Sequence, residues 1–306
     1  MKTTQALNDM TLTDLGRLTE GQARDFLEAL RWPNGPICPH CGVVSEATRL
    51  PQNGKVRAGL HQCNDCRGQF TVTVGTIFED SHIPLHKWVL AFGLMCSSKK
   101  GISALQLQRN LGLGSYKSAW FMAHRIRYAM QVGPFPPKLR GTVEVDETYV
   151  GARRKGKRGR GAANKTPVLA LVARRGQVRA KVITGTTGQE LKGAILEAVR
   201  SDARIMTDEL HSYWGIGKHF SGGHQTVGHG KKEYVRGDVH VNTAESFFAL
   251  LKRGIHGTFH HVSKRHLGRY ADEFEFRWNH RKVKDGARTV AAIKATAGKR
   301  LVYRAG

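Results

Sequence analysis

Three acidic residues lie within four positions of a strongly apolar stretch. Residues 142–149 read Thr-Val-Glu-Val-Asp-Glu-Thr-Tyr, and the valines on both sides of Asp146 predict a buried strand. Because unpaired carboxylates are unfavourable there, a cation is expected to offset their charge. Asp208 ends a second short apolar run, residues 205–207. If these strands are neighbours, Asp146 and Asp208 can together bind the two Mg²⁺ (or Mn²⁺) ions used in phosphoryl transfer.

A third metal ligand is expected from the helix that opens near Asn242. Asn242, Glu245 and Lys252 are spaced three and seven positions apart, so they share one helical face. Glu245 is favoured as the ligand, because an anion balances two divalent ions better. Asn242 remains the alternative, either as a neutral oxygen ligand or as a helix cap. Lys252, two turns beyond Glu245, and the adjacent Arg253 can contact a phosphate.

Two close cysteine pairs predict a second metal site. Cys38 and Cys41, and Cys63 and Cys66, are each separated by two residues, with 21 residues between the pairs. Four thiolates in this spacing complete a closed tetrahedral shell around Zn²⁺, so the site is expected to be structural. Redox-active pairs are the less favoured alternative. Cys96 stands alone and is expected in the core.

The charge of the chain indicates a polyanionic partner. Its 306 residues carry a net charge of +25, which self-repulsion makes unfavourable unless a polyanion such as DNA neutralises it. The uncharged apolar stretch 88–98 is too short to span a bilayer, and residues 1–10 lack the apolar core of a signal peptide. We therefore expect a cytoplasmic, nucleoid-associated protein without a membrane partner.

A basic, glycine-rich loop follows the Asp146 strand. Six cations lie within nine residues, and the glycines between them leave the backbone free to follow a phosphate chain. We expect DNA contact there. The cations are Arg153, Arg154, Lys155, Lys157, Arg158 and Arg160.

The elements that carry these residues predict a multi-domain chain. We expect an N-terminal helix, together with the residues that end it, over 11–36. A zinc ribbon is expected over 37–75. A helix-turn-helix-like DNA-binding segment is expected over 85–131, with Lys117 and Arg125 facing outward. After the linker at 133–137, the order of strands and helices over 139–284 is that of a ribonuclease-H-like α/β domain with a mixed sheet.

The motifs together resemble one family of bacterial insertion-sequence transposases. Asp146, Asp208 and Glu245, with 36 residues between the last two, resemble the DDE triad of transposases and retroviral integrases. Residues 145–151, 242–245 and 251–254 are similar to a family in which a zinc ribbon and a helical DNA-binding segment precede a compact DDE domain. Members of that family have either Asn or Glu as the third catalytic residue.

The resemblance implies metal-dependent cleavage of double-stranded DNA at the element's terminal inverted repeats, followed by strand transfer into target DNA. It also implies that protomers assemble as a homo-oligomer on paired ends. Two other interpretations stay open from the residues alone. One is a zinc-ribbon DNA-binding regulator without catalysis, and the other is a structure-selective nuclease on the same fold.

Overall fold

The computed structural model describes residues 4–54, 56–151 and 165–302. The chain forms two compact units, Met1–Met130 with Lys282–Gly306, and Gln131–Arg281. The basic loop lies outside the described residues, and with it the six cations named above. None of the described helices is both long enough and apolar enough to cross a bilayer.

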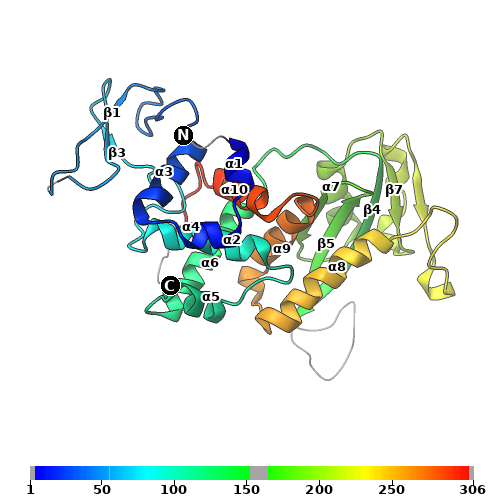
Figure 1. The fold of residues 1–306 in the computed structure, drawn as a ribbon. Coiled ribbons are helices and arrows are strands. Elements are labelled where there is room, and N and C mark those ends of the chain that lie inside the picture. The colour runs from blue at the N-terminus through cyan, green and yellow to red at the C-terminus, as the bar shows by residue number, and fades with distance from the viewer. Residues whose placement is uncertain (1–3, 55, 152–164, 303–306) are drawn as a thin grey trace. The chain divides into compact units, whose positions relative to one another are not determined.

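A five-stranded mixed sheet forms the centre of the second unit (Figure 1). Its strand order is β6-β5-β4-β7-β8; β4, β5 and β6 are antiparallel neighbours, and β7 and β8 run parallel to β4. This confirms the predicted mixed α/β domain. The strands are β4 (Thr142–Gly151), β5 (Lys165–Ala173), β6 (Val178–Val182), β7 (Arg204–Thr207) and β8 (His224–Thr226).

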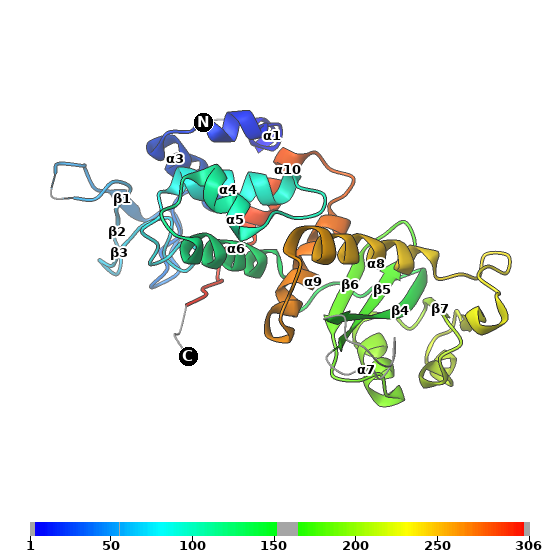
Figure 2. The same cartoon turned by 90° about the horizontal axis from the view of Figure 1, so that it is seen from below.

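Helices cover both faces of this sheet. α7 (Gly188–Ala198) lies on one face, whereas α8 (Asn242–Gly254) and α9 (Lys264–Asn279) lie on the other, as Figure 2 shows. The odd-numbered residues Val143 and Val145 of β4 pack in the cluster that includes α7. Because strand side chains alternate, the even-numbered residues, Asp146 among them, are directed to the α8 face.

The first unit combines a helical bundle with a small cysteine-bearing sheet. The central helix α4 packs against α2, α3 and α10, and its buried face includes Trp88, Phe92 and Cys96, which agrees with the expected core position of Cys96. The helices are α1 (Thr4–Asn8), α2 (Leu12–Gly16), α3 (Glu20–Arg31), α4 (Leu85–Ser97), α5 (Ala104–Leu111), α6 (Tyr116–Met130) and α10 (Asp285–Lys294). The antiparallel sheet consists of β1 (Ala47–Arg49), β2 (His61–Cys63) and β3 (Gln69–Phe70).

The single helix expected within 11–31 is two helices, and local hydrogen bonds explain the break. Thr11 and Asp14 form a capping box at the start of α2, and Thr19 and Gln22 form another at the start of α3. A capping box satisfies backbone amides at a helix start, so the second box favours a new helix at Glu20 over continuation. The apolar periodicity predicted the buried face but missed this break.

The two helices expected in the segment after the ribbon are present. Ser103 caps α5 by accepting a hydrogen bond from the amide of Gln106, and Gly112 ends it with a positive φ of 56°. α10 was not foreseen. It returns the chain to the first unit, where Gly286 approaches Asn8 so closely that a Cβ would lie 2.4 Å from the Asn8 carbonyl oxygen.

Candidate metal centres

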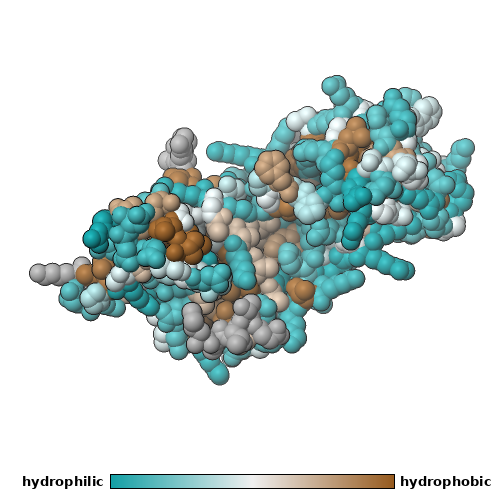
Figure 3. Space-filling view, turned by 90° about the horizontal axis from the view of Figure 1, so that it is seen from above, coloured by the Kyte–Doolittle hydropathy of each residue, from teal (hydrophilic) through white to brown (hydrophobic). Residues whose placement is uncertain are grey.

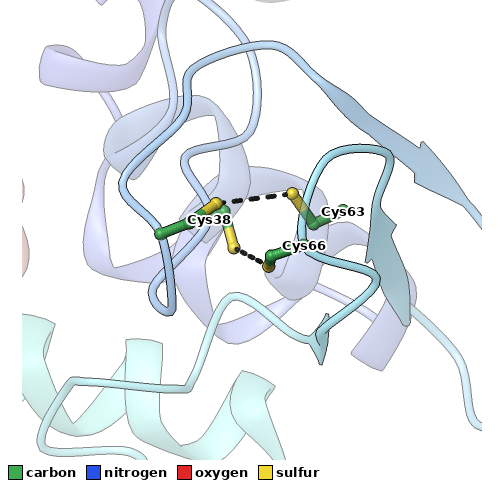
Figure 4. A group of neighbouring side chains, drawn as sticks. Cys38, Cys63 and Cys66 are labelled. Atoms are coloured by element: carbon green, nitrogen blue, oxygen red, sulfur yellow. Dashed lines mark hydrogen bonds between the residues drawn. The ribbon is translucent and has the colours of Figure 1, made fainter.

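The four cysteines of the two pairs converge in the first unit. Sγ of Cys38 lies 3.6 Å from Sγ of Cys66, and Sγ of Cys41 lies 3.6 Å from Sγ of Cys63. Figure 4 shows Cys38, Cys63 and Cys66 turned toward one another. All four sulfur atoms lie within 4.8 Å of one another. A tetrahedral ion with Zn–S bonds of about 2.3 Å separates its sulfurs by about 3.8 Å, whereas a disulfide bond is about 2.05 Å long. The donor set therefore fits structural Zn²⁺.

Two similar turns place these thiols. The amide of Gly42 donates to the carbonyl of Cys38 at 2.9 Å, and the amide of Arg67 donates to the carbonyl of Cys63 at 3.1 Å. Both donors have a positive φ, 81° at Gly42 and 59° at Arg67. Burial acts to raise the pKa of the Cys38 thiol, but hydrogen bonds from backbone amides at Cys41 and His40 lower it to about 6. The first turn thus favours the thiolate of Cys38, whereas the neighbouring thiols raise the pKa of Cys41 and Cys66.

The register of β4 and β7 brings two candidate acids together in the second unit. These strands are parallel, and their last pair joins Glu144 to Met206. Continuing that register by two residues sets Asp208 beside Asp146. The carbonyl of Asp208 accepts a hydrogen bond from the hydroxyl of Thr207 at 2.7 Å, and its carboxylate accepts one from the amide of Leu210 at 3.0 Å. Asp208 is therefore held at the tip of β7.

The pKa of Asp146 is raised by burial and by nearby negative charges. Burial, together with the charges of Glu147, Asp208 and Glu245, raises the pKa of Asp146 to about 7. The amide of Glu147 opposes them through a hydrogen bond of 2.8 Å. Asp208 and Glu245 are thus each within electrostatic reach of Asp146, although in the described residues only the cysteines form a group with ligand atoms within 4.8 Å. Converging carboxylates fit a hard divalent cation.

A buried carboxylate that sequence reasoning did not assign connects β4 to α8. Glu144 is fully buried, and one of its carboxylate oxygens accepts hydrogen bonds from the amides of Thr243 at 2.7 Å and Ala244 at 3.1 Å. The Thr243 hydroxyl and the Arg174 guanidinium donate to its other oxygen at 2.9 and 2.6 Å. His240 Nδ1 lies 3.2 Å from that same oxygen. Glu144 therefore caps the helix that carries Glu245.

The Glu144 contacts also bear on the two alternatives for Asn242. The residue before α8 is Val241, and no side-chain cap is formed by that position. Glu144 therefore supplies the cap that was one of the alternative roles for Asn242. Asn242, Glu245 and Lys252 are all exposed along α8, as one helical face requires. The role of Glu144 could have been found from its spacing to Asp146. Residues two positions apart in a strand lie on the same face, which here is the α8 face.

Glu147 points to the opposite face of β4 and is also engaged. The hydroxyl of Tyr213 donates to its carboxylate at 2.7 Å. Tyr213 is fully buried in the cluster that includes α7, and burial followed by the Glu147 charge raises its pKa well above the ordinary value. The segment that follows Asp208 is thus anchored beside the candidate acids.

The structure corrects one of the expected DNA contacts. Arg125 is buried, and its guanidinium donates to the carbonyls of Ile77 at 2.8 Å, Glu79 at 2.9 Å and Leu301 at 3.1 Å. It ties together segments of the first unit and is not directed outward, because α6 is buried well beyond the apolar stripe read from its sequence. Lys117, by contrast, is exposed at the start of α6.

A four-cysteine ribbon together with a mixed α/β domain that gathers acids at adjacent strands is the arrangement of the DDE class of transposases. A model of the ISXO2-like transposase domain matches residues 138–279, and a model of the transposase zinc-ribbon domain matches residues 18–69. An uncharacterized protein in transposable element ISH50 of Halobacterium salinarum is 33% identical over 278 residues, covering 85% of this chain and 91% of that protein. The chain belongs to the ISXO2-like family of insertion-sequence transposases with an N-terminal zinc ribbon. This membership favours transposition over the regulator and the structure-selective nuclease.

Proposed function

We propose that this transposase cleaves phosphodiester bonds at its element's terminal inverted repeats and joins the freed 3′-hydroxyls to target DNA. The observation that carries the proposal is the β4–β7 register, which sets Asp208 beside Asp146, with the charge of Glu245 also acting on Asp146. Acids from two strands and a helix suit metal-dependent phosphoryl transfer. Protomers are expected to act as a homo-oligomer on paired ends.

Asp146, Asp208 and Glu245 would hold divalent metal, Mg²⁺ or Mn²⁺, at this site. Bound metal supplies activation of the attacking hydroxyl and stabilisation of the leaving oxygen. The protein contributes rigid placement, because the Glu144 carboxylate fixes the start of α8 and the Leu210 amide holds the Asp208 side chain. Water in the first step, and the DNA 3′-hydroxyl in the second, is the nucleophile.

The DNA would be bound by exposed cations in both units. Lys252 and Arg253 are exposed in the last turn of α8 in the second unit, and Lys117 is exposed in the first unit. We infer that Lys252 contacts a phosphate near the scissile bond and that the segment of residues 85–131 contacts the repeat. Figure 3 shows that hydrophilic residues cover most of the second unit on the face drawn. Phosphate contacts of this kind make binding strongly salt-dependent.

The test is cleavage and strand transfer by the full chain on duplexes that end in the element's repeats, with and without Mg²⁺. Asp146→Asn and Asp208→Asn should each abolish both steps while leaving DNA binding intact. Asp202→Asn is the matched control, because Asp202 is an exposed acid of the same unit paired with Arg200 at 2.8 Å. Full activity in Asp146→Asn or Asp208→Asn would refute the proposal.

A further inference from the structure

Two exposed aromatic side chains lie in the segments that follow β7 and β8. Trp214 is 60% exposed and Tyr234 is 58% exposed. Each has a histidine ring beside it: His211 lies 4.2 Å from Trp214 and His229 lies 5.2 Å from Tyr234, measured between ring centroids. Because β7 and β8 are parallel, both segments leave the sheet at the edge where Asp208 lies.

The Trp214 segment is anchored to Glu147, the residue that follows Asp146. Tyr213 is buried and bonded to Glu147, the neighbour of Asp146, and Ser212 donates from its hydroxyl to the carbonyl of Thr186 at 2.7 Å. With Tyr213 held inward, the next residue presents its indole to solvent. The indole is therefore carried by a segment that is anchored on both residues before it, Ser212 and Tyr213.

The Tyr234 segment is fixed in a similar way. Glu209, which directly follows Asp208, accepts hydrogen bonds from the amides of His229 at 2.8 Å and Gly230 at 2.9 Å. Lys231 and Lys232 are exposed within this segment. Exposed aromatics accompanied by cations are what single-stranded nucleic acid binds, because bases stack on the rings while phosphates contact the charges.

We propose that Trp214 stacks against an unpaired base of the element end next to the scissile phosphodiester, with the Tyr234 segment bordering the same nucleotide. The proposal rests on the proposed function, since it requires a DNA end at the acids. Duplex DNA must lose a base pair for this contact, and stacking on the indole offsets part of that loss. The ligand of the Trp214 indole is therefore a nucleobase. Any of the four bases can bind, because every base has a face that can stack.

The test compares Trp214→Ala, Trp214→Phe and Phe135→Ala in the full chain. Phe135 is the matched control, since it is an aromatic residue 95% exposed in the linker of the same unit. Cleavage is measured on fully paired ends and on ends with a mismatch at the terminal base pairs. The fluorescence of 2-aminopurine at those positions is followed on binding in Ca²⁺.

Trp214→Ala should slow cleavage of paired ends roughly 5- to 150-fold, which is the range for losing one stacked base. A mismatch should restore most of the rate, and Trp214→Phe should lie between wild type and Trp214→Ala. The 2-aminopurine signal should change with wild type and with Phe135→Ala but not with Trp214→Ala.

Equal cleavage of paired ends by Trp214→Ala and Phe135→Ala overturns the proposal, as does a defect that a mismatch leaves unchanged. A smaller mass for Trp214→Ala in light scattering without DNA would assign the indole to a contact between copies of the chain, and it also overturns the proposal. Absence of metal-dependent cleavage by wild type would instead refute the proposed function, so the two failures are distinguishable.

Discussion

The carboxylate of Glu144 accepts a hydrogen bond from the amide of Thr243 at 2.7 Å, which joins the strand of Asp146 to the helix of Glu245. Glu144 lies two residues before Asp146, and Thr243 lies two residues before Glu245. The buried carboxylate of Glu144 therefore helps to set the separation of the two candidate acids, together with the apolar packing of α8 on the sheet. An acidic group at a helix N-terminus is also favoured by the helix dipole.

Glu144→Gln should lower both stability and activity. The amide keeps the shape of the side chain, but its NH₂ group must face a donor, either Arg174 or the α8 amides. We expect a loss of about 1–3 kcal/mol in the free energy of unfolding, because buried donors are left unsatisfied. Cleavage at saturating DNA should also fall, because α8 is less well held.

Glu197→Gln is the control for the Glu144 substitution. Glu197 pairs with Lys181 at 3.0 Å, but both side chains are exposed, so this change should leave unfolding and cleavage nearly unaltered. If Glu144→Gln unfolds and cleaves like Glu197→Gln, Glu144 does not position α8 for catalysis.

Single substitutions on α8 should identify the third metal ligand. The charge of Glu245 acts on Asp146, whereas Asn242 is neutral and neither caps α8 nor shares that effect. Glu245→Gln should therefore reduce metal-dependent cleavage by more than the roughly 10- to 100-fold caused by losing an outer-shell partner. Asn242→Ala should cause a smaller loss. The opposite ranking, measured at saturating Mg²⁺ and DNA, would assign the ligand to Asn242.

The zinc site should be removable without touching the second unit. The full chain should contain about one Zn²⁺ by elemental analysis, and Cys63→Ser should lose it because three thiolates do not complete the shell. Cys96→Ser is the matched control, since Cys96 is a buried cysteine in α4 outside the cluster. Equal zinc content in the two variants would show that the cluster is not the metal site.

The sequence predicted best where residue type and local pattern together determine position. Alternating valines fixed the strand of Asp146, and a two-residue gap fixed each cysteine turn. The break before α3 was missed because the apolar stripe continues across it. The hydrogen bonds of Thr19, which cap the start of α3, determine where the new helix begins. Arg125 was misplaced for a related reason. Its partners are backbone carbonyls from distant segments. Because every residue has a backbone carbonyl, the sequence does not show which carbonyls will accept from Arg125.

Glu275 should make stability depend on pH. Burial raises its pKa to about 7 from an ordinary 4.5, although the Ala180 amide and Arg179 oppose this. The folded protein therefore favours the protonated form, so this contribution is present in full below pH 4.5 and is lost as the pH rises to about 7. The loss is on the order of 3 kcal/mol.

Comparison with Glu275→Gln isolates that group. The glutamine variant should gain stability relative to wild type as the pH rises from about 4.5 to 7, because it cannot ionise. Chemical unfolding at several pH values measures the difference. A difference that stays constant with pH would contradict the raised pKa of Glu275.

Arg125 and Lys117 should separate a structural cation of α6 from a DNA-binding one. Arg125→Ala leaves the carbonyls of Ile77, Glu79 and Leu301 without their donor, so the first unit should lose about 2–4 kcal/mol of stability. The salt dependence of DNA binding should stay as in wild type wherever the variant is folded. Lys117→Ala should instead leave unfolding unchanged and reduce the slope of log affinity against log salt by about one. If Arg125→Ala reduced the slope of log affinity against log salt and Lys117→Ala did not, Arg125 would be a DNA-binding residue after all.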